Sequence, residues 1–135
     1  MASEVVIMIG FPGSGKSSYI RENFDAVDYH IIDGDRYKTP KTMVRQASLF
    51  VDQRSIVFDS TGYSVAKRAA FVQFANECGL PVRAVWISTS LEDSQAQNDL
   101  RGAAGGNHVP EEAYQFYATA FEEPSEEEGF VLEIV

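Results

Sequence analysis

Cysteine, histidine and long apolar runs are scarce in this 135-residue sequence. The single cysteine, Cys78, cannot form a disulfide within the chain, which fits a reducing compartment. Two histidines with no neighbouring cysteine leave no cluster of the kind that binds zinc. No apolar run approaches the ~20 residues of a membrane-spanning helix, and no basic segment precedes the first apolar run as in a signal peptide. We therefore expect an intracellular protein, cytoplasmic or nuclear, with no membrane partner.

Basic residues are absent after Arg101, where eight acidic residues account for most of the net charge of −9. Such a charge normally argues against a nucleic-acid partner. Between residues 36 and 51, however, there are basic residues and no acids; they are Arg36, Lys38, Lys41 and Arg45. Because salt screens charges beyond ~10 Å, this cationic stretch can hold a phosphate locally, or it can be an ordinary solvated helix face.

A phosphate-loop motif occupies residues 10–17, G-F-P-G-S-G-K-S, and fits the pattern G-x-x-x-x-G-K-[ST]. An apolar strand over residues 5–9 leads into it, and a helix over residues 17–24 follows it. The glycines let successive backbone N–H groups point at phosphate oxygens, and the positive end of the helix dipole adds to the attraction. We expect the nucleotide to contact Gly10, Pro12, Gly13, Ser14, Gly15, Lys16, Ser17 and Ser18.

Apolar and helix-like segments alternate along the rest of the chain, which predicts one α/β domain, residues 1–135, with a parallel sheet. Further strands are expected at residues 29–32, 55–58, 82–87 and 130–135. Helices are expected after the caps Thr39 (to about Val51), Ser64, Ser90 and Pro110. The glycine-rich residues 102–107 lack side chains for a core, so we expect them to be mobile.

Phosphoryl transfer needs a phosphate-binding cation, a metal site, a base and positive charge near the moving phosphate. Lys16 is expected to reach the β- and γ-phosphates of ATP, and Ser17 with Asp59 to hold Mg²⁺. Asp35 is the candidate general base, whereas Asp33 is either a base or part of a turn. Arg101 can swing over the phosphates, or it can simply favour a helix C-terminus. We expect core positions for Trp86 and for the regularly spaced aromatic residues Tyr114, Tyr117 and Phe121.

Several short motifs follow one another in the order seen in a known family. They are the phosphate loop, an acidic loop ending at Asp35, Asp59-Ser60-Thr61, Arg68 in the next helix, Leu91-Glu92 with Asn98 and Arg101, and His108-Val109-Pro110. With these motifs the chain resembles, nearly end to end, the kinase domain of polynucleotide 5′-hydroxyl kinases.

The resemblance implies an adenylate-kinase-like P-loop NTPase fold: three layers, four or five parallel strands and a short mobile lid at about residues 95–109. It implies transfer of the γ-phosphate of ATP, with Mg²⁺, to a 5′-hydroxyl of DNA or RNA, on a single strand or a duplex end. It implies Asp35 as base and Arg101 as lid arginine. The expected substrate contacts are Asp33, Arg36, Lys38, Thr61 and Arg68.

Two positions depart from the family pattern. Gly62 stands where the family usually has Asn, and Asp99 where a basic lid residue is common. The Asp33-Gly34-Asp35 loop is also similar to that of small-molecule kinases such as adenylylsulfate kinase and gluconate kinase. The acceptor could therefore be another hydroxyl, on a nucleoside, a hydroxymethylated base in DNA or a small metabolite. A nucleotide-binding switch that transfers no phosphate is the remaining alternative.

Overall fold

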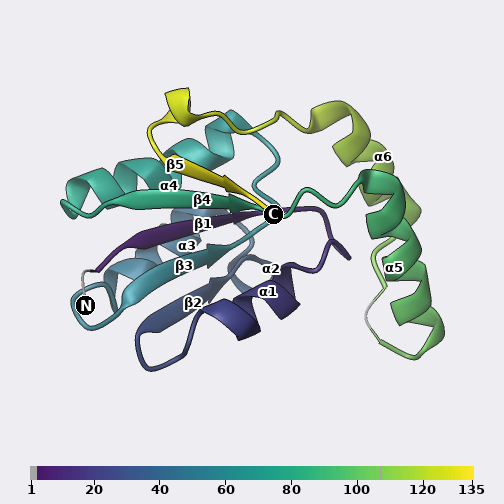
Figure 1. Cartoon of the computed structure of the whole chain (residues 1–135), viewed down its shortest axis with the longest axis horizontal. Coiled ribbons are helices and arrows are strands. Elements are labelled where there is room, and N and C mark those ends of the chain that lie inside the picture. The colour runs from purple at the N-terminus through teal and green to yellow at the C-terminus, as the bar shows by residue number, and fades with distance from the viewer. Residues whose placement is uncertain (1–2, 107) are drawn as a thin grey trace.

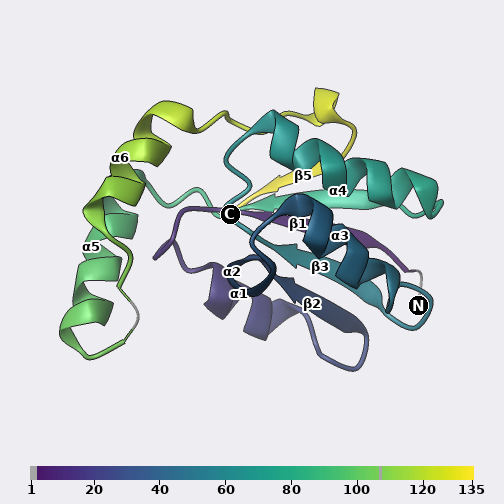
Figure 2. The same cartoon turned by 180° about the vertical axis from the view of Figure 1, so that it is seen from behind.

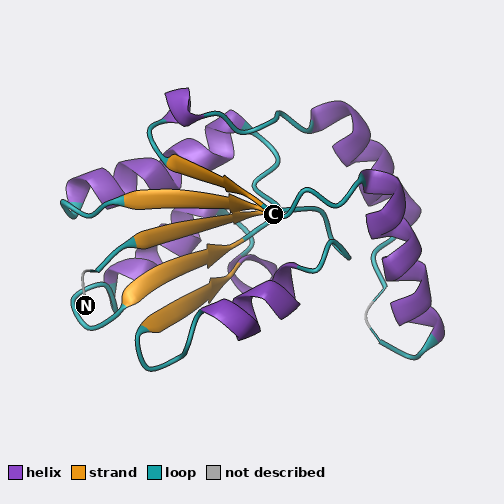
Figure 3. Ribbon diagram, viewed as in Figure 1, coloured by secondary structure: helices purple, strands orange, loops and turns teal. Residues whose placement is uncertain are grey.

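Five parallel strands form one sheet in the computed structural model, which describes residues 3–106 and 108–135 (Figures 1 and 3). The order across the sheet is β2-β3-β1-β4-β5. The strands are β1 (Val5–Ile9), β2 (Tyr29–Asp33), β3 (Ser55–Asp59), β4 (Val82–Trp86) and β5 (Val131–Ile134). Strand β1 takes the central place because all five of its residues are apolar and fully buried.

Helices cover both faces of the sheet, as Figure 1 and the reverse view in Figure 2 show. Helix α1 (Lys16–Asn23) packs on one face through Ile20. Helices α3 (Pro40–Ser48) and α4 (Val65–Glu77) pack on the other face. The chain thus has the predicted three-layer α/β fold of P-loop NTPases.

Helices α5 (Leu91–Ala103) and α6 (Glu111–Ala120) stand beyond the carboxyl ends of the strands (Figure 1). They sit beside the edge where loops from different strands meet, which is where α/β sheets place their ligands. Two shorter elements complete the structure, the helical turn α2 (Gly34–Tyr37) and the 3₁₀ turn η1 (Glu126–Glu128). None of the described helices is long and apolar enough to cross a membrane.

Most helix starts agree with the sequence prediction. The side chains of Thr39, Ser64 and Ser90 each accept a hydrogen bond from a backbone N–H in the first turn of α3, α4 and α5. Helix α3 is shorter than expected: after Ser48 the backbone tightens, and the N–H groups of Phe50 and Val51 both bond to the carbonyl of Ala47. Residues 52–54 then turn back into β3.

A charged cluster ties four strands together near the amino ends of β1 and β4. The Glu4 carboxylate accepts hydrogen bonds from Arg83 at 2.7 and 3.1 Å and from the Tyr29 hydroxyl at 2.6 Å. Arg83 also donates to Glu133 on β5 at 3.1 Å and lies over the ring of Phe24. Burial alone would raise the pKa of Glu4, but the hydrogen bonds from Arg83 and Tyr29 bring that pKa below its ordinary value.

Candidate functional site

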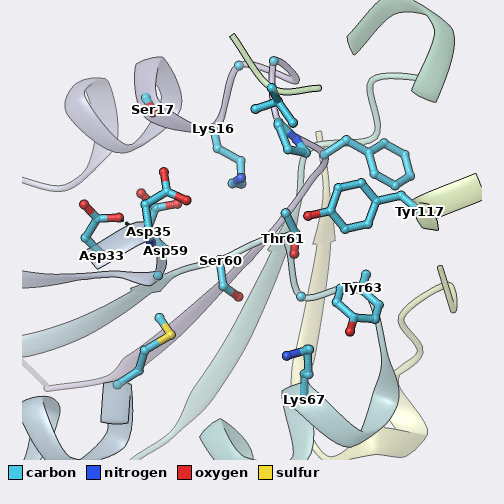
Figure 4. Close-up of a pocket in the computed structure, with 18 of the residues that line it drawn as sticks. Lys16, Ser17, Asp33, Asp35, Asp59, Ser60, Thr61, Tyr63, Lys67 and Tyr117 are labelled. Atoms are coloured by element: carbon cyan, nitrogen blue, oxygen red, sulfur yellow. Dashed lines mark hydrogen bonds between the residues drawn. The ribbon is translucent and has the colours of Figure 1, made fainter. Parts of the chain in front are cut away.

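A cavity of about 740 Å³ opens at the carboxyl edge of the sheet (Figure 4). One side is the phosphate loop, and another is formed by acidic residues that end β2 and β3. The first turn of α4 and residues of α5 and α6 complete the wall. Segments far apart in the sequence therefore share one site, which the parallel topology brings together at this edge.

The phosphate loop has the conformation that its glycines permit. Gly13 and Gly15 have φ angles of 82° and 103°, in the left-handed region that a side chain disfavours. Gly15 is the N-cap of α1, and it has no side chain to accept hydrogen bonds from the first N–H groups of that helix. The first residues of the helix line the cavity. An anion at this helix start would satisfy these donors.

Lys16 carries its charge inside the cavity wall. Its Nζ donates to the carbonyl of Gly10 at 3.1 Å, and burial lowers the pKa of the ammonium. The charges of Asp59 and Asp35 oppose that shift, which places both carboxylates within electrostatic reach of Lys16. A half-buried cation of this kind is suited to pair with an anion entering the cavity.

The back of the phosphate loop is fixed to the helices that follow β4. The Thr89 hydroxyl donates to the carbonyl of Ser14 at 2.8 Å, and the Tyr114 hydroxyl donates to the carbonyl of Pro12. Gly13 touches α5 so closely that a Cβ there would lie 2.3 Å from the carbonyl oxygen of Ser94. The loop therefore keeps its shape before any nucleotide binds.

Three aspartates gather opposite Lys16, as Figure 4 shows. Asp33 and Asp59 are register partners on β2 and β3, and Asp35 follows in α2. Like charges on neighbouring strands destabilise a sheet. The two aspartates therefore indicate a functional role and not a stabilising one. Burial raises the pKa of Asp59, Asp33 and Asp35 add to that rise, and Lys16 opposes it.

Asp33 and Asp35 differ in their hydrogen bonds. Oδ1 of Asp33 accepts the backbone N–H of Asp35 at 2.9 Å, so Asp33 acts as the N-cap of α2. The Asp-Gly-Asp segment is accordingly the start of a short helix. The side chain of Asp35 lies in the cavity facing Lys16, where a base would be needed (Figure 4).

The donors for a magnesium ion fit that ion chemically. The Ser17 hydroxyl and the Asp59 carboxylate both line the cavity, and Mg²⁺ prefers such oxygen ligands. Within residues 3–106 and 108–135, no three acidic, His or Cys side chains come close enough to enclose a metal by themselves. Mg²⁺ suits such a sparse set because it keeps several water ligands and binds substrate phosphates.

Helix α5 brings the predicted lid arginine to the site. Arg101 lines the cavity, its charge contributes to lowering the pKa of Lys16, and it donates to Oδ1 of Asn98 at 3.2 Å. Asn98 is buried and also bonds both the N–H and the carbonyl of Val109, each at 2.8 Å. The expected glycine patch begins inside α5, which is helical through Ala103. Asn107, at its end, lies outside the described residues.

Asp99, the acidic residue at an expected basic position, has a local partner. Its Oδ1 lies 3.1 Å from Nε2 of His108, which joins the end of α5 to the segment before α6. The other departure, Gly62, has a φ of 56° and lies against Ile9. Its left-handed backbone suits glycine, and asparagine is one of the few other residues that tolerate it.

The predicted substrate residues fall into two groups. Asp33, Lys38 and Thr61 line the cavity. The remainder of the cationic stretch, Arg36, Lys41 and Arg45, is exposed and does not line it.

Arg68 requires a correction, because the structure buries it completely. Its guanidinium donates to both carboxylate oxygens of Glu128, at 2.8 and 3.0 Å, and to the carbonyl of Gly62. The guanidinium is buried and its hydrogen bonds go to other residues of the chain. Arg68 therefore holds the loop after β3 in place and does not contact a substrate. Glu128 is 60 residues away in sequence, and no local pattern shows this pairing.

Other cavity residues were not predicted from the sequence. Tyr117 was expected in the core but lines the cavity, whereas Tyr114 is buried as expected. Tyr63, Lys67 and Gln97 also line the cavity. Tyr63 and Lys67 lie within eight residues of the end of β3, at the carboxyl edge of the sheet, and this position is the sequence signal for them.

The comparisons with known proteins agree with this architecture. The model of a family described as AAA domain matches residues 41–124, which is more than half of the chain. The chain belongs to this AAA-domain family. It has the P-loop and the all-parallel sheet described above, as expected for a P-loop NTPase fold.

Two relatives of this AAA domain are polynucleotide-modifying enzymes by name. It is 28% identical over 129 residues to a bifunctional polynucleotide phosphatase/kinase of Schizosaccharomyces pombe, and 31% identical over 132 residues to a candidate bifunctional polynucleotide phosphatase/kinase of Acanthamoeba polyphaga mimivirus. Each match covers 94% of this chain but only 32% and 31% of the relative. This chain thus spans about a third of the length of these relatives. Its sequence is similar to that of polynucleotide kinases.

Among solved structures, Chaetomium thermophilum Kti12 in complex with ADP-AlF3 is similar in fold. The TM-score is 0.83, and the match covers 97% of this chain and 88% of that one at 13% identity. At 13% identity this similarity shows a shared fold only. The Kti12 structure contains a bound nucleotide analogue, ADP-AlF3.

Proposed function

We propose that this chain is an ATP- and Mg²⁺-dependent polynucleotide kinase that transfers the γ-phosphate of ATP to a 5′-hydroxyl end of DNA or RNA. The observation that carries the proposal is the placement of Lys16 and Asp35 on facing sides of one cavity. A cation for the donor phosphates and a carboxylate for the acceptor hydroxyl are the two groups that a kinase must hold together.

Each residue has a part in this reaction. Ser17 and Asp59 would hold Mg²⁺, which would offset the charge of the phosphates, and ATP would be the phosphoryl donor. Lys16 and the backbone N–H groups of the loop bind the phosphates, and Arg101 offsets the charge that develops during transfer. Asp35 orients the acceptor hydroxyl and takes its proton as the new oxygen–phosphorus bond forms and the bond to ADP breaks.

The choice of acceptor is supported by two further points. Both relatives are named for polynucleotide chemistry, although the match spans only part of each. Lys38 adds a positive charge to the lining of the cavity in a protein whose total charge is −9. An acceptor with a phosphate close to its hydroxyl would use that charge, whereas an uncharged metabolite would not.

The test is a transfer assay with radiolabelled ATP and a panel of acceptors. We expect label on 5′-hydroxyl oligonucleotides and none on the same oligonucleotides carrying a 5′-phosphate, which serve as the matched control. Nucleosides, a small sugar acid and DNA with hydroxymethylated bases complete the panel. Transfer to one of these and to no 5′-hydroxyl end would replace the polynucleotide acceptor with that compound.

The alternative outside the enzymes is a nucleotide-binding switch that transfers no phosphate. It would bind ATP with Mg²⁺ but label no acceptor at any concentration. Equilibrium binding of ATP, measured on the same preparation, separates this outcome from a protein that is simply misfolded.

A further inference from the structure

Three cavity residues have no part in the transfer chemistry proposed above. Tyr63 lies between β3 and α4, Lys67 lies in the first turn of α4, and Tyr117 lies on α6. Figure 4 shows them beyond Ser60 and Thr61, on the opposite side from the three aspartates. We call these three residues the cation–aromatic arm of the cavity.

The charge of Lys67 does not stabilise the helix that carries it. The positive end of the helix dipole lies at the first turn, so a cation there is unfavourable. In the part of the chain that the structure describes, no carboxylate forms an ion pair with Lys67. Its Nζ lies 5.2 Å from the centre of the Tyr63 ring, a weak contact that an anion can outcompete.

Tyr63 is held as a rigid platform. Its ring meets Phe116 edge to face at 5.1 Å and lies 5.7 Å from Tyr117. Its backbone carbonyl accepts the N–H of Glu122 at 2.7 Å, which anchors the loop to the segment after α6. A half-buried aromatic ring fixed in this way loses little freedom when a flat ligand stacks on it.

The cavity is also large enough for two ligands. Its volume of about 740 Å³ lies in the upper half of the range of ~300–1,000 Å³ that is usual for small-molecule sites. The phosphate loop and aspartates use one side, which leaves the cation–aromatic arm for the part of an acceptor beyond its hydroxyl. A cation beside an aromatic ring matches a phosphate next to a base.

We infer that the cation–aromatic arm binds the acceptor on the 3′ side of the reacting nucleoside. Lys67 pairs with the phosphate that links the first and second nucleotides, and the Tyr63 ring stacks on a base. The inference rests on the proposed function and adds the two residues that make the enzyme prefer a polynucleotide to a free nucleoside. Lys67 and Tyr63 are positioning residues, since neither touches the transferred phosphate.

The first test is the variant Lys67→Met, which keeps the length of the side chain and removes its charge. We expect the ratio of kcat/KM on a 5′-hydroxyl dinucleoside monophosphate to that on the matching nucleoside to fall about 10-fold. Lys41→Met is the matched control, because Lys41 is an exposed lysine of α3 that does not line this cavity. That variant should keep the wild-type ratio.

Salt dependence gives a readout that a merely structural role would not change. Binding of a single-stranded 5′-hydroxyl oligonucleotide is measured over a range of salt concentrations for the same three proteins. Each lost phosphate contact should reduce the slope of log K against log salt by about 0.7. We expect this reduction for Lys67→Met and an unchanged slope for Lys41→Met.

Tyr63 is tested with two variants that separate the ring from the hydroxyl. Tyr63→Phe keeps the ring and should retain oligonucleotide affinity, whereas Tyr63→Leu should lose about 5- to 10-fold, because stacking on a base is removed. Circular dichroism and urea unfolding identify any loss of folding in the leucine variant. Equal losses for both variants would contradict stacking.

The possible results keep the inference and the proposed function distinguishable. If the wild-type protein phosphorylates 5′-hydroxyl ends but Lys67→Met keeps both the wild-type ratio and slope, the inference is wrong and the function stands. If the wild-type protein phosphorylates no polynucleotide end, both are wrong. A normal ratio with a reduced slope would place Lys67 on a more distant phosphate and overturn its assignment to the first linkage.

Discussion

Two aspartates that are two positions apart have different tasks in this site. Asp33 uses its carboxylate to cap α2, and Asp35 presents its side chain to the cavity opposite Lys16. The sequence left Asp33 open as a base or a turn residue, and the hydrogen bond to the N–H of Asp35 favours a positioning role. An amide oxygen can replace a carboxylate as a cap but cannot accept the proton of a hydroxyl.

Substituting each aspartate by asparagine is therefore informative. We expect Asp35→Asn to lower the rate of phosphoryl transfer by ~10²-fold or more, because the general base is removed. Nucleotide affinity should be retained, since Asp35 does not belong to the phosphate loop. Single-turnover transfer and equilibrium ATP binding measure the two effects.

The control for this prediction is Asp33→Asn, which keeps the cap of α2. We expect a loss of less than ~10-fold in the same transfer assay. A larger loss for Asp33→Asn than for Asp35→Asn would exchange the roles of the two residues.

Arg68 illustrates what sequence alone cannot show at the scale of single residues. The resemblance to polynucleotide 5′-hydroxyl kinases implies a substrate contact for Arg68. The structure instead pairs Arg68 with Glu128 and the carbonyl of Gly62. Because the partner comes from the far end of the chain, only the three-dimensional arrangement reveals the correction.

Among the elements, the phosphate loop and helix α5 behave as one assembly. Thr89, Tyr114 and the close approach of Gly13 to Ser94 join them from behind. The motif predicted the loop and its glycines, but it carried no information about what lies behind Gly13. That contact is set by how β4 leads into α5 beside β1.

Gly13→Ala tests this contact. The added Cβ would lie 2.3 Å from a backbone oxygen, which cannot rotate away, and the φ of 82° is strained for alanine. We expect the loop to shift and ATP affinity to fall at least ~10-fold. Titration with a fluorescent ATP analogue measures the affinity.

A second glycine provides the matched control. Gly79 also has a left-handed φ, of 68°, but a Cβ there would meet no atom within 4 Å. Gly79→Ala should cost about 1 kcal/mol of unfolding free energy through backbone strain and leave ATP affinity at the wild-type value. Equal effects of the two variants on affinity would refute a specific role of the contact with α5.

The remaining elements show where sequence patterns are sufficient. The first three strands could be predicted because their apolar runs end at glycine or aspartate, and the caps Thr39 and Ser64 mark helix starts directly. The ends of helices are harder. Gly102 lies within α5 because a glycine in a helix is only mildly unfavourable.

For the whole molecule, the cluster around Glu4 links both ends of the chain to the sheet. It contains Arg83 on β4, Tyr29 on β2 and Glu133 on β5. Its effect on stability depends on pH. Since the pKa of Glu4 is lower in the folded protein than its ordinary value, ionised Glu4 stabilises the fold above its unfolded pKa.

Glu4→Gln should therefore destabilise the protein in a pH-dependent way. We expect a loss of about 1 to 2 kcal/mol of unfolding free energy at pH 7, because hydrogen bonds to a charged group are lost. The difference from the wild type should shrink as pH falls below the ordinary Glu pKa of about 4.3 and through the lower pKa of folded Glu4, where the wild-type carboxylate is protonated. Urea unfolding at several pH values measures the difference.

Glu133→Gln is the control within the same cluster. Glu133 makes one contact with Arg83 at 3.1 Å, and its side chain is 45% exposed. The expected cost is about 0.5 kcal/mol or less. If Glu133→Gln is as destabilising as Glu4→Gln, the half-buried Arg83–Glu4 pair has no special share in the stability.

The all-parallel sheet has a practical consequence for attaching this protein to other molecules. Because β5 runs the same way as the other strands, Val135 bonds to Trp86 and Ser88 at the carboxyl edge of the sheet, whereas Glu4 lies at the opposite edge (Figure 1). An affinity tag or sensor surface joined at the carboxyl end would lie at the edge of the sheet where the proposed polynucleotide acceptor enters. Immobilisation through the amino end leaves that approach open.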